Sequence, residues 1–242
     1  MLELNAASIR MLELNAALLT ANQIPECKED ASAERPMTQV GESLMEASLP
    51  THLLSMKATT KVGTWNVRTM YETGKAAQVA NEMKRYNIQV LGICESRWNG
   101  SGLTTLATGE KILYSGHAEE NHDHKEGVAI MMYPAAANAL MEWQPVSSRI
   151  MKARFNSKGR KVTIIQCYAS TNGADEETKE TFYDALQTVV DELPKRDIKL
   201  LMGDMNAKIG KDNTGKELIM GTQALGDMNE NGEMFTDFFC LQ

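Results

Sequence analysis

Polar side chains follow four short apolar runs of this 242-residue chain. Asn66 follows "KVGTW", Glu95 follows "LGIC", Tyr168 closes "IIQCY", and Asp204 and Asn206 follow the run "KLLMG". Each residue alone also fits an ordinary structural role, such as a turn, a helix cap or a half-buried aromatic. Because polar residues recur at all four places, we expect them to form one shared site.

The residue types at these positions suit chemistry on a phosphate ester. Glu95 offers the hard, anionic oxygen that Mg²⁺ prefers, and Mg²⁺ commonly takes only one or two carboxylates together with waters and a substrate phosphate. Asp204 is suited to orient or deprotonate a water for attack. Asn66, Asn206 and the Tyr168 hydroxyl are donors for phosphate oxygens on which negative charge accumulates. The expected reaction is phosphoester hydrolysis.

The elements that would position these residues alternate between short apolar strands and amphipathic helices. Strands are expected at the four runs above and at "GVAIMMY", and a hairpin is expected over residues 149–169 around "NSKGRK". A helix is expected over residues 176–193, because Phe182, Leu186, Val189 and Leu193 follow a helical period and Pro194 ends the pattern. Continuous apolar runs indicate strands covered on both faces. The pattern therefore favours a layered α/β or α+β sandwich.

Composition narrows the class of protein. The net charge is −7, but residues 1–60 hold 4 Lys/Arg against 8 Asp/Glu, which leaves a nearly balanced 21 against 24 for residues 61–242. This balance gives no sign of wholesale phosphate neutralisation. The four cysteines form no CxxC pair, and Cys94 and Cys167 lie in apolar runs, so packed thiols are expected. No stretch predicts a membrane span or a signal peptide, and the expected location is nuclear or cytoplasmic.

Residues 1–60 differ from the rest of the chain in composition and in hydrophobic pattern. "MLELNAA" occurs at residues 1–7 and again at 11–17, and a polar stretch broken by Pro25 and Pro36 follows. We therefore expect a flexible leader with a short duplicated segment over residues 1–60, and one domain over residues 61–242.

The ordered motifs of the domain resemble a known family. "GTWNVRTM", "LGICESRW", "GVAIMM", "CYAS" and "GDMNAKIG" resemble the motifs of the endonuclease/exonuclease/phosphatase superfamily. With "NENGEMFTDFF", they are most similar to the apurinic-type endonuclease domain of non-LTR retrotransposons and to the related group of craniofacial development protein 2-like proteins. The resemblance covers residues 61–242. It implies an α+β fold, a four-layered αββα sandwich of two packed mixed β-sheets flanked by helices.

The resemblance also implies roles for the five polar residues. Glu95 matches the metal-binding glutamate and Asn66 the asparagine beside the metal, so both are expected metal-site residues. Tyr168 matches the tyrosine on the phosphate side. Asp204 and Asn206 match the pair that positions the water and the leaving group. The implied cofactor is Mg²⁺ or Mn²⁺, and the implied partner is DNA.

One family feature has no counterpart in this sequence. The family carries a late Ser-Asp-His motif, whose histidine binds the phosphate, whereas the histidines here are His52, His117, His122 and His124. The resemblance therefore implies a domain truncated at its C-terminus, with its last strands missing and an exposed sheet through which the chain self-associates.

Three functions stay open from the sequence. The first is a Mg²⁺-dependent endonuclease that hydrolyses the DNA backbone and derives from a non-LTR retrotransposon. The second is a catalytically incompetent remnant or partial gene product, acting at most as a nucleic-acid-binding or protein-binding module. The third is a related enzyme that acts on RNA or on a phosphorylated small molecule.

Overall fold

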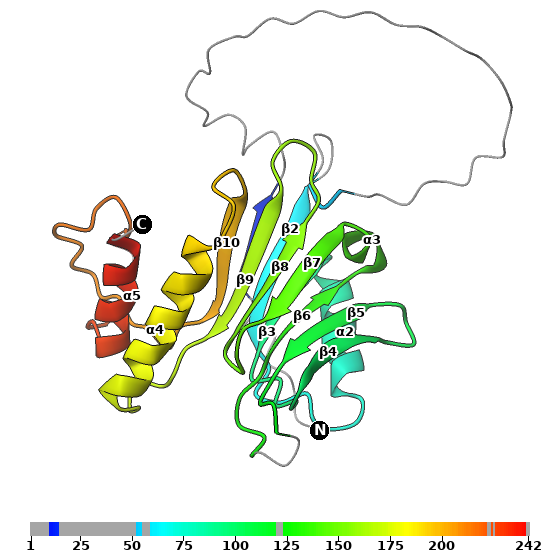
Figure 1. The fold of residues 1–242 in the computed structure, drawn as a ribbon, viewed down its shortest axis with the longest axis horizontal. Helices are drawn as coiled ribbons and strands as arrows, with labels where there is room; N and C mark the ends of the chain where they lie inside the picture. Colours follow the sequence, from blue (N-terminus) through cyan, green and yellow to red (C-terminus); the bar gives the residue numbers. More distant parts are fainter. Residues whose placement is uncertain are drawn as a thin grey trace, which may run out of the picture.

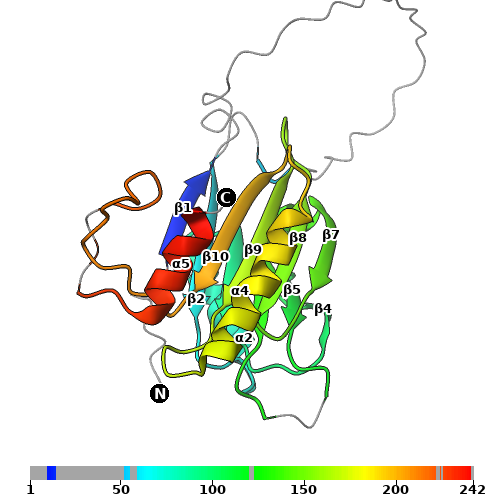
Figure 2. The same ribbon diagram turned by 60° about the vertical axis from the view of Figure 1, so that its left-hand side comes forward.

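The chain folds into two β-sheets that pack face to face, with helices on their outer faces (Figures 1 and 2). This computed structural model describes residues 10–14, 52–54, 59–119, 123–221, 224 and 226–240. The order of layers is helix, sheet, sheet, helix. The α+β sandwich predicted from the sequence is therefore confirmed, whereas the expectation that its last strands are missing stays a prediction.

The first sheet has six strands in the order β1-β2-β3-β6-β5-β4. Its strands are β1 (Arg10–Leu14), β2 (Thr60–Asn66), β3 (Val90–Cys94), β4 (Ser101–Thr105), β5 (Lys111–Ser115) and β6 (Val128–Met132). β2 and β3 run parallel, with Asn66 opposite Cys94, and the other pairs are antiparallel. Every residue of β3 and β6 is buried, as their continuous apolar sequences predict.

The second sheet has four strands in the order β10-β9-β8-β7. Its strands are β7 (Leu140–Pro145), β8 (Ile150–Phe155), β9 (Val162–Tyr168) and β10 (Ile198–Asp204). β8 and β9 form the predicted antiparallel hairpin. β9 and β10 run parallel, and their last residues, Tyr168 and Asp204, lie opposite each other. In each sheet, therefore, one pair of parallel strands ends at the site expected from the sequence.

Helices cover the outer faces of the two sheets (Figures 1 and 2). They are α2 (Lys75–Arg85), α4 (Glu176–Asp191) and α5 (Glu230–Cys240), whereas the short α3 (Pro134–Ala137) buries Ala136 and Ala137 in the core between the sheets. α2 packs Val79 and Met83 against the first sheet. α4 begins at the N-cap Asp175, whose side chain accepts a hydrogen bond from the backbone N–H of Thr178 (2.7 Å). Its predicted apolar stripe is buried against the second sheet, together with Phe238 of α5.

The core between the sheets holds the two parallel pairs in register. Val62, Val90, Leu113 and Ile130 of the first sheet pack there against Ala153, Phe155 and Ile164 of the second. Cys94 and Cys167 are buried free thiols, as predicted. Close packing of this kind allows little relative movement of the sheets, because even one methylene is felt in a dense core.

Parts of the predicted leader, residues 1–60, lie in the described structure. Met11 and Leu12 belong to β1, which pairs with β2. Leu54 is completely buried in the core between the sheets, and its carbonyl accepts a hydrogen bond from the backbone N–H of Lys158 (3.1 Å). The first copy of the duplicated segment, residues 1–7, lies outside the described residues. The boundary at residue 60 stays a prediction.

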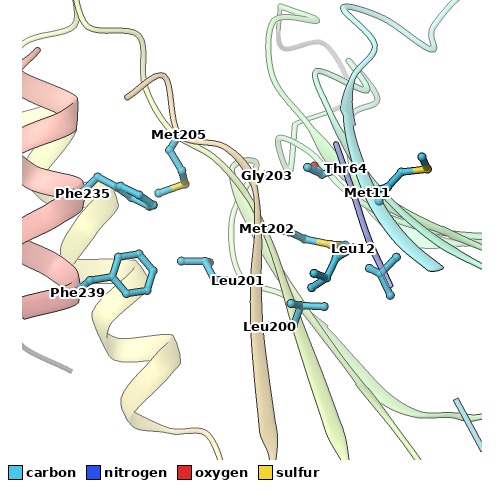
Figure 3. Close-up of a pocket in the computed structure, with 12 residues that line it drawn as sticks. Met11, Leu12, Thr64, Leu200, Leu201, Met202, Gly203, Met205, Phe235 and Phe239 are labelled. Atoms are coloured by element: carbon cyan, nitrogen blue, oxygen red, sulfur yellow. The ribbon is translucent and has the colours of Figure 1, made fainter. Parts of the chain in front are cut away.

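An apolar cleft lies along the open edge of β10 (Figure 3). Phe235 and Phe239 of α5 point toward Leu201 and Met205, while Met202 lies on the side of β1. The cleft has a volume of about 280 Å³. Within the described residues β10 pairs only with β9, so one of its edges offers unpaired backbone groups.

None of the helices in the described ranges is long and apolar enough to cross a bilayer.

Leu54 gives a direct test of whether the predicted leader contributes to the fold. Leu54→Ala should lower the free energy of unfolding by about 2 to 5 kcal/mol, because it leaves a cavity at a fully buried position. Urea unfolding measures this difference. Leu218→Ala, at a fully exposed leucine, is the matched control and should change stability by less than about 0.5 kcal/mol. Equal midpoints for the two variants would place Leu54 outside the core.

Candidate functional site

The five residues expected from the sequence come together at one end of the sandwich. Asn66, Tyr168 and Asp204 are the last residues of β2, β9 and β10, and Glu95 directly follows β3. Parallel strands end on the same side of a sheet, so each sheet delivers two neighbouring strand ends. The packing of the two sheets brings these four ends into hydrogen-bonding contact.

The side-chain amide of Asn66 joins the two sheets at this site. Its Nδ2 donates to Glu95 Oε1 (2.8 Å) and to Asp204 Oδ2 (2.9 Å). Its Oδ1 accepts from the backbone N–H of Arg68 (3.1 Å), which fixes the amide so that the nitrogen faces the carboxylates. One nitrogen therefore holds two carboxylates that are separated by 109 positions in the sequence.

Glu95 lies in a strained loop directly after β3. Its φ is 55°, and that of Arg97 is 58°, a region that residues with a side chain rarely adopt. Oε1 of Glu95 accepts from Asn66 and also from the Tyr168 hydroxyl (3.0 Å), while Oε2 lies 3.5 Å from the guanidinium of Arg97. Strain of this kind clusters at functional sites, where surrounding contacts hold it in place.

Tyr168 is held as a neutral hydrogen-bond donor. Burial, followed by the negative charge of Glu95, raises the pKa of its phenol well above the ordinary value of 10.0, although the nearby Arg149 acts in the opposite direction. The hydroxyl therefore keeps its proton into the alkaline range and donates to Glu95. Arg149 lies over the Tyr168 ring, 5.1 Å from its centre, and holds that face of the ring.

Asp204 and Asn206 form the turn that their spacing predicts. The backbone N–H of Asn206 donates to Asp204 Oδ1 (3.1 Å), and Asn206 has a φ of 49°. The Asn206 side chain, however, donates to the backbone carbonyl of Ala169 (2.9 Å). Asn206 thus orients Asp204 through its backbone and ties the end of β10 to that of β9.

A buried thiol forms the floor of the site. Cys94 Sγ accepts from the backbone N–H of Asp204 (3.2 Å) and from the Gln166 amide (3.1 Å), and donates to the carbonyl of Cys167 (3.1 Å). Burial raises the pKa of Cys94, so the thiol keeps its proton. A Cβ at Gly92 would lie 1.8 Å from the Gln166 Oε1, so this glycine makes room for the amide.

Sequence reasoning missed the residues that support the site from behind. The guanidinium of Arg149 donates to the carbonyl of Tyr168 (3.2 Å) and to Glu126 Oε1 (2.6 Å). No local pattern marks Arg149, because its partners lie in other strands and loops.

Asn229 is a second missed support, and it does have a sequence signal. It precedes α5 and accepts at Oδ1 from the backbone N–H groups of Gly232 (2.8 Å) and Lys208 (2.8 Å), while its Nδ2 donates to the carbonyl of Asn206 (3.2 Å). An asparagine immediately before a helical segment is a common N-cap, and "NENG" fits that pattern. The start of α5 therefore fastens the loop that carries Asp204 and Asn206.

The described histidines His117 and His124 contact residues other than the five of the cluster. His124 Nδ1 hydrogen-bonds the carbonyl of Arg97 (2.9 Å), and His117 pairs with Glu126 (3.1 Å). His122 falls outside the described residues. In the described ranges no three His, Cys, Asp or Glu side chains gather as a metal-binding group.

Comparison with known proteins gives two kinds of relative. No family model matches the chain. Craniofacial development protein 2 of Bos taurus and that of Tragulus javanicus are each 35% identical over 177 residues, which is 73% of this chain and 29% and 30% of those proteins. The chain thus spans less than a third of the length of these curated relatives. This match confirms the resemblance to that group predicted from the sequence.

Solved structures with a partial likeness are nucleases and related proteins. The endonuclease domain of TRAS1, a telomere-specific non-LTR retrotransposon, is 14% identical, with a TM-score of 0.48, over 74% of this chain and 70% of that chain. An endonuclease/exonuclease/phosphatase family protein from Leptotrichia buccalis is 16% identical, with a TM-score of 0.43, over 61% of this chain and 66% of that chain.

Cys94 gives a test of the floor of the site. Cys94→Ala should lower the free energy of unfolding by about 1 to 3 kcal/mol, because it leaves the Asp204 N–H and the Gln166 amide without their buried acceptor. Chemical unfolding followed by circular dichroism measures this. Cys240→Ala, at an exposed free cysteine, is the control and should stay within about 0.5 kcal/mol of the parent. A Cys94 variant as stable as the control contradicts the proposed role of the thiol.

The buried thiols and phenols also predict how stability depends on pH. Burial raises the pKa values of Cys94, Cys167, Tyr168 and Tyr183 in the folded chain. The unfolded chain ionises first, at the ordinary values of 9.0 for Cys and 10.0 for Tyr, so the folded state binds more protons above that range. The free energy of unfolding should therefore fall as pH rises through 9 and 10.

Urea midpoints measured across this alkaline range provide the readout. Tyr168→Phe should make the fall shallower, since it removes one of the groups that the unfolded chain ionises. A midpoint that stays constant through the range would show that these groups are accessible to ionisation in the folded chain.

Proposed function

We propose that this chain is a divalent-metal-dependent phosphodiesterase of endonuclease type that hydrolyses the DNA backbone. The observation that carries the proposal is the Asn66 amide, which holds Glu95 and Asp204 together across the two sheets. Structural packing alone gives no reason to place two carboxylates on one donor at the end of a sandwich. The sequence resemblance to retrotransposon endonucleases supports the same conclusion.

The donor set fits a hard cation. Glu95 supplies carboxylate oxygens, and Mg²⁺ or Mn²⁺ binds such oxygens, commonly one or two carboxylates with the rest of the shell made of water and phosphate. We propose Glu95 as the principal ligand, with Asn66 beside it. When bound, the cation would supply charge neutralisation for the phosphate. Tyr168 and Asn66 both donate to Glu95, which orients its carboxylate toward that role.

The chain's own residues then provide the remaining parts of a hydrolysis. Asp204 is held by Asn66 on one oxygen and by the Asn206 N–H on the other, so its carboxylate is fixed in place to accept a proton from an attacking water. The water oxygen bonds to phosphorus, the P–O ester bond opposite it breaks, and the leaving alkoxide takes up a proton from solvent water. The Arg97 guanidinium lies beside Glu95, where it can donate to phosphate oxygens as negative charge develops. The neutral Tyr168 has one O–H, which donates to Glu95, so it would reach a phosphate oxygen only by exchanging that partner.

A second function, in a different class, is a nucleic-acid-binding module without hydrolysis. The hydrogen bonds of the cluster favour this function. Three of the four carboxylate oxygens of Glu95 and Asp204 already accept hydrogen bonds from groups of the protein. The described His124 contacts the Arg97 carbonyl rather than a carboxylate of the cluster. Under this proposal the arginines beside the cluster hold a phosphate without cleaving it.

The substrate, the cellular location and the self-association of the chain are also proposals. DNA is the proposed partner, with RNA or a phosphorylated small molecule as alternatives for the same site. An activity on DNA favours a nuclear location over a cytoplasmic one. Self-association is proposed through the open edge of β10 and its apolar cleft.

Nicking of supercoiled plasmid in the presence of Mg²⁺ tests the proposal. Asp204→Asn should reduce nicking about 100-fold or more while leaving metal binding largely intact, because the carboxylate is assigned to the water. Glu95→Gln should weaken Mg²⁺ or Mn²⁺ binding measured by calorimetry. Asp184→Asn, at an exposed acid on α4, is the matched control and should behave as the parent chain.

The outcomes separate the two candidate functions. Nicking that persists in Asp204→Asn would contradict the assigned site. Metal binding that depends on Glu95, with DNA binding but no nicking by the parent chain, would favour the binding module.

A further inference from the structure

An aromatic pocket lies next to the candidate site, on the far side of the loop that follows β3. Its volume is about 490 Å³. It is lined by Tyr71, Trp98, Asn99, Thr104, Tyr114 and His124. This size falls within the range of pockets that bind small organic groups. The proposed hydrolysis does not use this pocket, although Trp98 and Tyr114 also pack against the core of the first sheet and α2.

Two ring pairs form the walls of the pocket. Trp98 and Tyr114 meet edge to face, with centroids 5.2 Å apart and an interplanar angle of 87°. The indole is fixed, because its Nε1 donates to the carbonyl of Met70 (3.0 Å). Tyr71 and His124 lie 4.2 Å apart between centroids and are tilted by 36°. The pocket is therefore built from rings held in defined orientations.

Tyr71 is the least expected member of this group. It is 63% exposed, whereas a large aromatic side chain normally buries most of its surface. Its backbone N–H donates to the Thr69 hydroxyl (3.1 Å), so the turn that carries it is ordered. An exposed ring on an ordered turn, stacked beside a pocket, is available to contact a planar ligand.

The pocket and the candidate site share one short loop. Glu95 belongs to the carboxylate cluster, Arg97 lies against Glu95 (3.5 Å), and Trp98 is the next residue and lines the pocket. His124 of the pocket bonds the carbonyl of Arg97 (2.9 Å). A ligand with a phosphate at Glu95 and Arg97 would therefore place the group attached to that phosphate close to the rings.

We propose that this pocket binds one unstacked nucleobase of the nucleic-acid strand whose phosphate occupies the candidate site. The inference rests on the proposed function for the identity of that strand. Aromatic rings stack on any nucleobase, because every base has a π-face. Asn99 and Thr104 add polar groups to the lining that suit the edge of a base. A base inside a continuous duplex is already stacked, so the pocket selects for a base that is unpaired or turned out.

Binding of short single strands in EDTA tests this without any cleavage. The probes are a labelled thymidine oligonucleotide and a strand of equal length in which every nucleoside is replaced by an abasic tetrahydrofuran residue, followed by fluorescence anisotropy. The parent chain should bind the thymidine strand about tenfold more tightly than the abasic strand, as expected for a stacked base. A uridine oligonucleotide and thymidine monophosphate, as parallel arms, separate DNA from RNA and from free nucleotides.

Substitutions at Tyr71 locate the effect, since this exposed ring is not required for the fold. Tyr71→Ala should remove most of the preference for the thymidine strand and leave the affinity for the abasic strand unchanged. Tyr71→Phe, which keeps the ring, should retain the preference. Leu103→Ala changes an exposed apolar residue of β4 outside the lining and should behave as the parent chain.

Equal affinity for the two strands in the parent chain, or an unchanged preference in Tyr71→Ala, would overturn the proposal. Its failure is distinguishable from that of the proposed function. Asp204-dependent nicking without a base preference would support the proposed hydrolysis and contradict base binding in the pocket. A base preference that depends on Tyr71, without any nicking, leaves the pocket standing and removes the hydrolysis.

Discussion

The hydrogen bonds of the Asn66 amide are the interaction on which the candidate site depends. Two carboxylates held close together repel each other, and this repulsion is stronger where water is partly excluded. Asn66 offsets part of it by donating one N–H to Glu95 of the first sheet and one to Asp204 of the second. The distance between the carboxylates is therefore set by how the two sheets pack. A change in the core between the sheets would move the site even where it touches none of its residues.

The backbone near the site is adapted to close approaches, between neighbouring strands of one sheet at Gly203 and between the two sheets at Gly92. A Cβ at Gly203 would lie 1.9 Å from the carbonyl oxygen of Cys167, so the strand next to Asp204 needs a glycine there. Gly92 leaves the space that Gln166 fills, and Gln166 in turn donates to Cys94. The glycine that ends the apolar run before Asp204 is thus explained by close approach as well as by the turn. The absence of a side chain at Gly92 and Gly203 lets the Cys94 thiol reach the backbone N–H of Asp204.

The sequence predicted the parts of the fold whose signal is local. The stripe of α4, the hairpin of β8 and β9, and the buried run of β3 each carry a local signal. β10 was expected to be buried because of its apolar run, but it is only partly buried, since one of its edges is open within the described residues. β4 was missed because its residues alternate between exposed and half-buried on a sheet edge, so that no apolar run marks it. β7 was missed because it lies at the edge of the second sheet and is mostly exposed. Edge strands are defined by their partners more than by their own residues.

The candidate site follows the same rule. Its five residues were predicted because they stand at strand ends, which apolar runs reveal. The geometry that joins them was not predictable, because Asn66 and Asp204 are brought together only by the packing of two sheets. Arg149 was missed since it acts through Tyr168 and Glu126, both distant in the sequence. Asn206 was predicted as a donor to phosphate, whereas its amide bonds Ala169, a contact that no spacing rule contains.

The loop after β3 shows how the strain at this site is used. Glu95 and Arg97 both have positive φ, at a cost of about 1 to 3 kcal/mol each, and a glycine would adopt the same backbone without it. Keeping side chains at both positions makes sense if those side chains are required, one within the cluster and one beside it. Within this loop Glu95 contacts Asn66, while Trp98, three residues later, packs against Tyr114. A single strained loop therefore sets the position of the carboxylate and of the aromatic pocket together, and neither can be moved without the other.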